Sequence, residues 1–147
     1  MKRIFLDTDL FVRYLRYPKD AHRADNNALL DKIKNSEIQG VTSVFNVLET
    51  CGVLSYNLSQ EDLISLFEGF QGYFNLQILF PSSRQDHLNY LLPDVFEQIK
   101  KKQSFGDAQV SMIVEQYHHQ LSCFITWNAK HFEGKLSIPV KTPKQYL

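Results

Sequence analysis

The chain has 147 residues, which suits one domain spanning 1–147 and is long enough to bury a substantial apolar core. It contains no run near the roughly 20 apolar residues of a membrane span, and the apolar stretch after its basic start stops at Asp7, too early for an export signal. The formal net charge is zero, so any surface for nucleic acid must be local. We therefore expect a cytoplasmic protein that does not cross a membrane.

The first half of the chain alternates apolar runs with segments of helical spacing. In chain order it predicts a strand at 3–6, a helix from about Leu10 to Pro18, a helix at 21–34, a strand at 39–42 and helices after Ser43 and Ser59. Both serines suit the N-cap position, because a serine hydroxyl accepts a hydrogen bond from a free N–H of the first turn. The inner faces of these last two helices are predicted to include Leu48 and Phe67.

The second half continues the alternation. It predicts a strand at 76–80, a helical segment at 84–102 with Pro93 as a break or a new first turn, a helix beginning at Gly106-Asp107, a strand at 122–126 and an edge strand at 138–140. Strands that alternate with helices indicate a mostly parallel, three-layer α/β sheet. Cys51 and Cys123 lie within apolar patterns, which favours two buried thiols over a disulfide.

Three acidic residues and one amide recur at boundaries of these elements. Asp7 ends the first strand, Glu49 lies in a helix among apolar neighbours, Asp107 lies in a first helical turn, and Asn128 follows the last strong strand. Because chemistry in open α/β sheets collects beyond the carboxyl ends of the strands, these side chains are expected to converge there.

Carboxylates brought this close raise one another's pKa and cost stability, and a divalent cation removes that cost. Hard oxygen ligands suit Mg²⁺ or Mn²⁺, and such an ion activates water for attack on a phosphodiester. The pattern therefore favours a hydrolytic nuclease. Each residue also has a structural interpretation: Asp7 as a helix N-cap, Asp107 as an acid that favours the helix dipole, and Asn128 as a turn residue. A structural interpretation is harder to find for Glu49, since a carboxylate among apolar neighbours needs a partner.

A basic segment offers a local surface for RNA. It runs from Arg13 to Arg23, includes Arg16, and has Tyr14 and Tyr17 interleaved. Cations neutralise phosphates while aromatic rings stack on unpaired bases. The alternative is a solvated helix face followed by a loop. The cations at 100–102 are instead typical of a helix C-terminus.

The chain resembles the PIN-domain ribonucleases, specifically the VapC-like toxins of prokaryotic toxin–antitoxin pairs. The matching segments cover nearly the whole chain in order: Phe5-Leu6-Asp7-Thr8-Asp9-Leu10, Ser43 with Asn46-Val47-Leu48-Glu49, Gly106-Asp107-Ala108, Ile125-Thr126-Trp127-Asn128-Ala129-Lys130-His131-Phe132, Ile138-Pro139-Val140 and Thr142-Pro143. The resemblance implies a PIN-like fold with a parallel sheet of four or five strands between helices. It also implies an RNA substrate, a Mg²⁺ or Mn²⁺ site, an antitoxin partner and a homodimer.

The resemblance assigns metal binding and catalysis to Asp7, Glu49 and Asp107. Many members carry a further Asp in the last motif, where this chain has Asn128 and, three residues later, His131. We expect the Asn128 amide to hold a water without adding charge. Asp9 is a candidate compensating metal ligand.

Thr8 and Thr126 are expected to orient the carboxylates through hydrogen bonds. Two alternatives remain open at this point. One is a phosphatase of the haloacid-dehalogenase type with Asp7 as nucleophile, and the other is a domain that binds RNA or a partner protein without cleaving.

Overall fold

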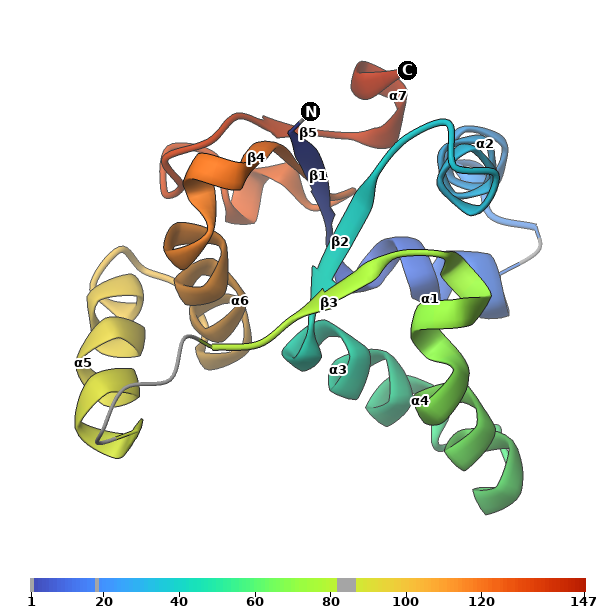
Figure 1. Cartoon of the computed structure of the whole chain (residues 1–147), viewed down its shortest axis with the longest axis horizontal. Helices are drawn as coiled ribbons and strands as arrows, with labels where there is room; N and C mark the ends of the chain where they lie inside the picture. The colour runs from blue at the N-terminus through green and yellow to red at the C-terminus, as the bar shows by residue number, and fades with distance from the viewer. Residues whose placement is uncertain (1, 18, 82–86) are drawn as a thin grey trace.

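A five-stranded parallel sheet forms the centre of the molecule (Figure 1). The computed structural model describes residues 2–17, 19–81 and 87–147, with the description of 87–92 limited to the backbone. The strands lie in the order β3-β2-β1-β4-β5. Their bounds are β1 Arg3–Leu6, β2 Gly40–Ser43, β3 Gln77–Leu79, β4 Leu121–Ile125 and β5 Val140–Lys141. The predicted parallel α/β sheet is confirmed.

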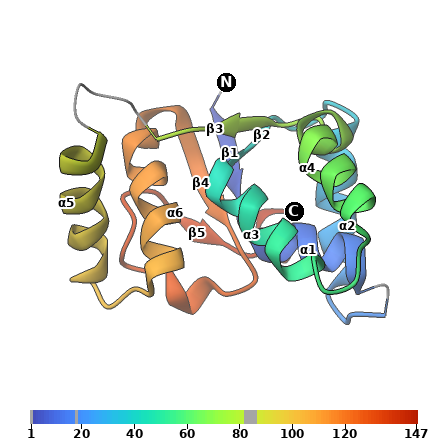
Figure 2. The same ribbon diagram turned by 90° about the horizontal axis from the view of Figure 1, so that it is seen from below.

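Helices cover both faces of this sheet, as Figure 2 shows, and complete the predicted three layers. The α-helices are α1 Thr8–Arg16, α2 Arg23–Lys34, α3 Val44–Leu54, α4 Gln60–Phe74, α5 His87–Ile99, α6 Phe105–Gln116 and α7 Pro143–Tyr146, with 3₁₀ turns η1 His118–Gln120 and η2 Ala129–His131. Helices α5 and α6 lie on one side, and α1, α2 and α4 lie on the other. No helix of the described residues is long and apolar enough to cross a membrane.

Alternation along β1 divides the core between the two faces of the sheet. Ile4 and Leu6 pack into the cluster formed with α1, α2 and α4, whereas Phe5 packs into the cluster formed with α6. Successive side chains of a strand point to opposite faces, so β1 needs apolar residues at each of its three buried positions. The Phe5 ring also stacks on Phe124 of β4, with centroids 5.3 Å apart.

The strand order places a crevice at the carboxyl ends of β1 and β4. After β1 the chain builds β2 and β3 on one side, and it then crosses to add β4 and β5 on the other. Loops that leave neighbouring strands in opposite directions open a binding crevice between them. The ladder continues into this crevice, because the Asp7 N–H donates to the Ile125 carbonyl at 3.0 Å. Asp7 and Thr126, which follow β1 and β4 directly, therefore lie side by side.

Several local predictions were wrong. Helix α5 runs through Pro93 rather than breaking there, because packing against α6 outweighs the loss of one backbone hydrogen bond. Leu48 and Phe67 are 51% and 48% exposed rather than buried. The helix α7 was not predicted, although Thr142 and Gln145 form a capping box around it. The predicted helix boundaries at Pro18 and Arg84 lie outside the described residues.

Other local predictions are confirmed. Ser43 and Ser59 are N-caps, and Ser43 forms a full capping box with Asn46. Cys51 and Cys123 are free and buried, and burial raises the pKa of both thiols.

We predict that Phe11→Ala lowers the free energy of unfolding by about 3–5 kcal/mol, the usual cost of emptying a buried phenylalanine site. Phe11 is fully buried and its ring meets those of Phe70 and Phe74 edge-on at 4.9 and 5.0 Å. The matched variant Phe67→Ala removes a half-exposed ring and should cost less than about 1 kcal/mol. Urea denaturation followed by circular dichroism measures both, and equal losses would contradict this description of the core.

Candidate active site

Asp7 is both a helix cap and a member of an acidic cluster. It is the N-cap of α1, and its Oδ1 accepts hydrogen bonds from the Thr8 N–H at 2.9 Å and from Asn46 Nδ2 at 3.1 Å. Its Oδ2 accepts from the Thr126 hydroxyl at 2.9 Å. Asp7 is therefore a helix N-cap and also lies at the carboxyl edge of the sheet. One carboxylate can do both, because it has enough lone pairs for the capping hydrogen bond and for further partners.

Asp9 lies beside Asp7 and shares its partner. Thr126 Oγ1 lies 2.9 Å from Asp7 Oδ2 and 3.1 Å from Asp9 Oδ2, and Oγ1 also accepts from the Asn128 N–H at 3.0 Å. A hydroxyl has one proton, so it satisfies only one of the two carboxylates at a time. The Trp127 N–H fixes Asp9 further by donating to Oδ2 at 2.9 Å. Asp9 therefore points into the cluster, where it supplies a carboxylate in addition to the three placed there by the sequence.

Asn46 connects two parts of the site, a role that the sequence analysis did not assign. Its Nδ2 donates to Asp7 Oδ1 at 3.1 Å and to Thr8 Oγ1 at 3.0 Å. Its Oδ1 accepts from the Ser43 hydroxyl at 2.6 Å. The sequence signal was the spacing Ser43 to Asn46, which is that of a capping box. The box that starts α3 thus also orients the side chain that holds Asp7.

Glu49 reaches the site from the exposed side of α3. Its apolar neighbours along the chain do not enclose it, because α3 buries Val47 and Cys51 and turns Leu48 and Glu49 outward. The Thr8 side chain hydrogen-bonds the Glu49 carboxylate. A Cβ atom placed on Gly106 would lie 3.5 Å from Glu49 Oε2, so this carboxylate also approaches the start of α6.

Asp107 and His131 form the outer border of the cluster. Asp107 lies in the first turn of α6, where its N–H donates to the Ser104 hydroxyl at 3.2 Å. Its Oδ2 lies 3.5 Å from His131 Nδ1. Asn128 is exposed and opens η2 without a side-chain capping hydrogen bond. The amide is therefore at the edge of the site rather than at its centre.

Burial raises the pKa of three of these carboxylates, and neighbouring charges add to the shift for Asp7 and Glu49. Burial and then the nearby charge of Asp9 hold the pKa of Asp7 well above its ordinary value. Burial also raises the pKa of Asp9, against the hydrogen bonds from Trp127 and Thr126. Desolvation of the Glu49 carboxylate raises its pKa, and the charge of Asp107 raises it further. Each shift shows that the folded protein disfavours the full negative charge of this cluster.

The donor set fits a hard divalent cation. Within the described ranges no three His, Cys, Asp or Glu side chains are grouped so that they could already hold a metal ion. The acids are nevertheless neighbours, since the charges of Asp9 and Glu49 act on Asp7 and that of Asp107 acts on Glu49. Asp9 Oδ1 is buried and has no hydrogen-bond partner among the described residues. A buried carboxylate oxygen without a donor, next to further carboxylates, is the environment that a cation with oxygen ligands stabilises.

The basic segment lies next to this cluster, but its members differ in availability. Arg13 lies 3.8 Å from Asp20 and has its guanidinium 5.8 Å from the Trp127 ring centre. Arg16 is exposed, and its guanidinium lies over the ring of Tyr17. Tyr14 packs edge-on against aromatic rings of α4, so its ring belongs to the core and is not free to stack on a base.

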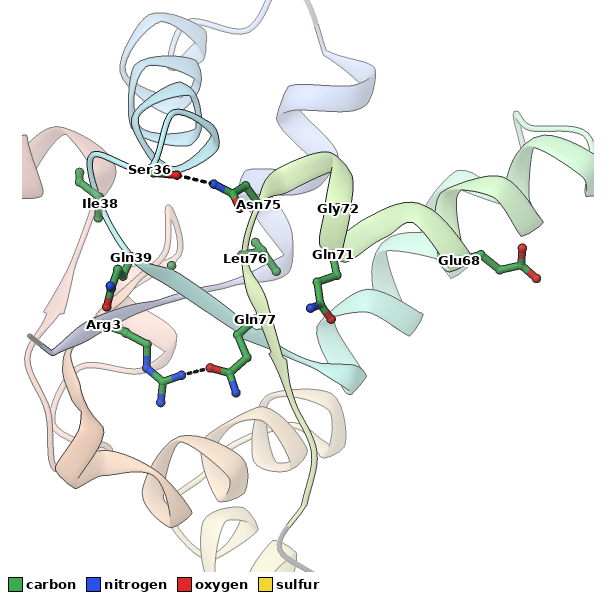
Figure 3. A pocket seen from close by; sticks show the side chains of 11 residues that line it. Arg3, Ser36, Ile38, Gln39, Glu68, Gln71, Gly72, Asn75, Leu76 and Gln77 are labelled. Carbon is green, nitrogen blue, oxygen red and sulfur yellow. Dashed lines mark hydrogen bonds between the residues drawn. The ribbon is translucent and has the colours of Figure 1, made fainter.

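A separate hollow of about 990 Å³ lies at the opposite edge of the sheet (Figure 3). It is lined at the amino ends of the strands by residues that include Arg3, Gly40 and Gln77. Arg3 reaches across it and donates a hydrogen bond to the Gln77 side chain. The hollow is distinct from the acidic cluster, which lies beyond the carboxyl ends of the same strands.

We predict that Asp9→Asn raises the melting temperature at pH 8 in EDTA by at least about 2 °C, or about 1 kcal/mol for a domain of this size. The folded-state pKa of Asp9 is raised, so the wild-type protein loses stability as pH rises from about 4, the ordinary Asp value, through the raised pKa. The amide does not titrate, so the difference should disappear near pH 4. Glu133→Gln, which removes an exposed charge, should change nothing. A variant less stable than the wild type at pH 8 would contradict the proposed cost of burying the Asp9 charge.

Comparison with known proteins gives a fold but no sequence family. No protein-family model matches the chain, and no curated protein does. FitAcB from Neisseria gonorrhoeae is 18% identical, with a TM-score of 0.64 over 96% of this chain and 98% of that one. VapBC2 from Rickettsia felis, bound to a promoter DNA fragment, is 17% identical, with a TM-score of 0.63 over 95% and 97%.

A third solved structure is VapC20 of Mycobacterium tuberculosis, described as a Sarcin-Ricin loop cleaving toxin. It is 15% identical, with a TM-score of 0.57 over 82% of this chain and 86% of that one. The chain therefore has the PIN-like fold of these VapC- and Fit-type proteins, as its motifs predicted.

Proposed function

We propose that this chain is a divalent-metal-dependent ribonuclease that acts as the toxin of a toxin–antitoxin pair. The observation that carries the proposal is the convergence of Asp7, Asp9, Glu49 and Asp107 at the carboxyl edge of the sheet, with the pKa raised on the first three. The structural neighbours support it, since one of them is described as a loop-cleaving toxin.

Asp7, Asp9, Glu49 and Asp107 would hold the Mg²⁺ or Mn²⁺ ion. When bound, the ion supplies charge neutralisation and an acidified water for attack on a phosphodiester. The Asp9 oxygen without a hydrogen-bond donor is the atom in greatest need of such a partner. With Asp9 counted, the site has four acids although Asn128 supplies no charge.

The remaining polar residues position these ligands. Thr126 and Asn46 hold Asp7 by one oxygen each, and Thr8 connects Asn46 to Glu49. The exposed Asn128 amide would hold a water or a phosphate oxygen at the rim of the site. Such fixed partners keep a carboxylate in one orientation.

We also propose an antitoxin partner and a homodimer. Leu48, Ile64 and Phe67 are 51%, 56% and 48% exposed on α3 and α4, and exposed apolar side chains on neighbouring helices are typical of a surface that binds protein. The neighbours FitAcB and VapBC2 support a paired toxin. One alternative, a domain that binds RNA or a partner without cleaving, is distinguished from the nuclease by the next experiment. The other alternative was a phosphatase, and no neighbour described above is named as one.

We predict that Asp107→Asn lowers RNA cleavage in Mg²⁺ or Mn²⁺ at least 100-fold, because the loss of one charge weakens both ion binding and charge neutralisation. Asp7→Asn should do the same, although it also disturbs the α1 cap. Cleavage of a labelled RNA on a denaturing gel measures both variants, with melting temperatures as a check on folding.

Asp25→Asn is the matched control for Asp107→Asn. Asp25 and Asp107 both occupy the third position of their helices, so the two changes alter the helix dipole alike. Asp25→Asn should cleave like the wild type, and EDTA should stop both. Full activity of Asp107→Asn, or cleavage that persists in EDTA, would refute the metal-dependent nuclease.

We predict that Arg13→Ala with Arg16→Ala weakens RNA binding and lowers the slope of log K against log salt by about 1.4, if each arginine neutralises one phosphate of a single strand. Fluorescence anisotropy at several salt concentrations measures the slope. Lys100→Ala with Lys101→Ala removes two cations just beyond the end of α5 and should leave the slope unchanged. Equal slopes in all three proteins would place the phosphate-binding surface elsewhere.

A further inference from the structure

Trp127 is held rigidly at the border of the acidic cluster. It is the single tryptophan of the chain, and its main-chain N–H donates to Asp9 Oδ2 at 2.9 Å. Its indole Nε1 donates to Asn26 Oδ1 at 2.9 Å. Asn26 is fully buried, and its Nδ2 donates to the Leu10 carbonyl at 3.1 Å. Because the backbone and the ring are both fastened, the indole plane is fixed in place.

An exposed imidazole covers this indole. The rings of His22 and Trp127 are stacked, with centroids 4.1 Å apart and planes 20° from parallel. His22 precedes α2 and makes no capping hydrogen bond with its side chain. The histidine is exposed whereas the tryptophan is partly buried. The pair is therefore a short stack whose inner ring is anchored in the protein and whose outer ring faces solvent.

Basic and acidic groups both lie close to this stack. The Arg13 guanidinium lies 5.8 Å from the indole centre, and Arg16 and Lys19 are exposed in the same segment. Asp9 accepts from the Trp127 N–H and is close enough to Arg13 for its charge to lower the Asp9 pKa. A strand with a phosphate near these cations would therefore have a base within reach of the stacked rings and lie next to the carboxylates.

We propose that an unpaired RNA base stacks on the outward face of His22 and extends the His22–Trp127 pair to three rings. Bases exposed in single strands and loops stack on histidine and tryptophan, whereas a base inside a duplex has both faces covered. The inference rests on the proposed ribonuclease function and specifies its substrate: RNA with an unpaired base next to the cleaved phosphate.

Removing a single base from the RNA tests this stack without changing the number of phosphates. Asp107→Asn protein in Mg²⁺ is titrated with a fluorescein-labelled single-stranded RNA hexamer and with hexamers that carry one abasic nucleotide at each position in turn. One abasic position should weaken binding at least about fivefold, the lower limit for one base–aromatic stack. In the double variant Asp107→Asn with His22→Ala, the hexamer that is abasic at this position should bind as tightly as the intact hexamer does.

Two substitutions separate stacking from charge. His22→Tyr keeps an aromatic ring and should restore the dependence on the base, whereas His22→Lys keeps a cation without a ring and should not. His119→Ala is the matched control. His119 also has a histidine ring beside its own, that of His118 at 3.8 Å with the planes tilted by 39°, but it lies at the amino end of β4, away from the carboxylates.

The stack is refuted if all abasic hexamers bind alike to the protein that retains His22, or if His22→Lys behaves like His22→Tyr. Cleavage by the otherwise unmodified chain, measured in parallel, separates this inference from the function on which it rests. If the RNA is cleaved but binding does not depend on any base, the stacking proposal is refuted and the nuclease proposal is retained. If binding depends on a base but no RNA is cleaved, the nuclease proposal is refuted and the stacking proposal is retained. If no RNA binds at all, both proposals are refuted.

Discussion

The arrangement of this site depends on one hydroxyl between two carboxylates. Thr126 Oγ1 lies within hydrogen-bond distance of both Asp7 and Asp9, yet it has one proton to donate. Burial at the carboxyl ends of β1 and β4 raises the pKa of both acids, and the hydrogen bonds from Thr126 oppose this rise without cancelling it. The folded chain therefore holds two carboxylates where their full charge is disfavoured, and a proton reduces that cost.

The rest of the fold makes the burial of these carboxylates possible. β1 is the central strand and buries apolar side chains on both faces, and this burial supplies stability that offsets the cost of the buried charges. The same helix starts that satisfy free N–H groups also fix the acidic cluster: Asp7 caps α1, and the capping box of α3 orients Asn46 toward Asp7. The same side chains therefore start the helices and shape the proposed site.

Charge in this site comes from a different position than the motif comparison implied. The final motif provides Asn128 and His131, and neither is acidic. Asp9 instead points inward, because the Trp127 N–H and the Thr126 hydroxyl hold its carboxylate. Asp9 therefore adds a carboxylate from the start of α1 to a site whose last motif supplies none. The same Trp127 residue carries the indole on which His22 stacks, so the segment after β4 shapes both the acidic cluster and its border.

The sequence by itself determined the order of strands and helices, the buried strand before Asp7 and the caps at Ser43 and Ser59, because these follow from local periodicity and from neighbours along the chain. It also placed Asp7 and Asp107 at boundaries where a parallel sheet gathers its loops. Only the tertiary structure decided that Asp9 faces Asp7, that Asn46 reaches Asp7 from 39 residues away, and that Glu49 comes from an exposed helix face. Those contacts depend on the crossover that sets β4 beside β1, and no local pattern specifies the angle at which a side chain enters a shared crevice.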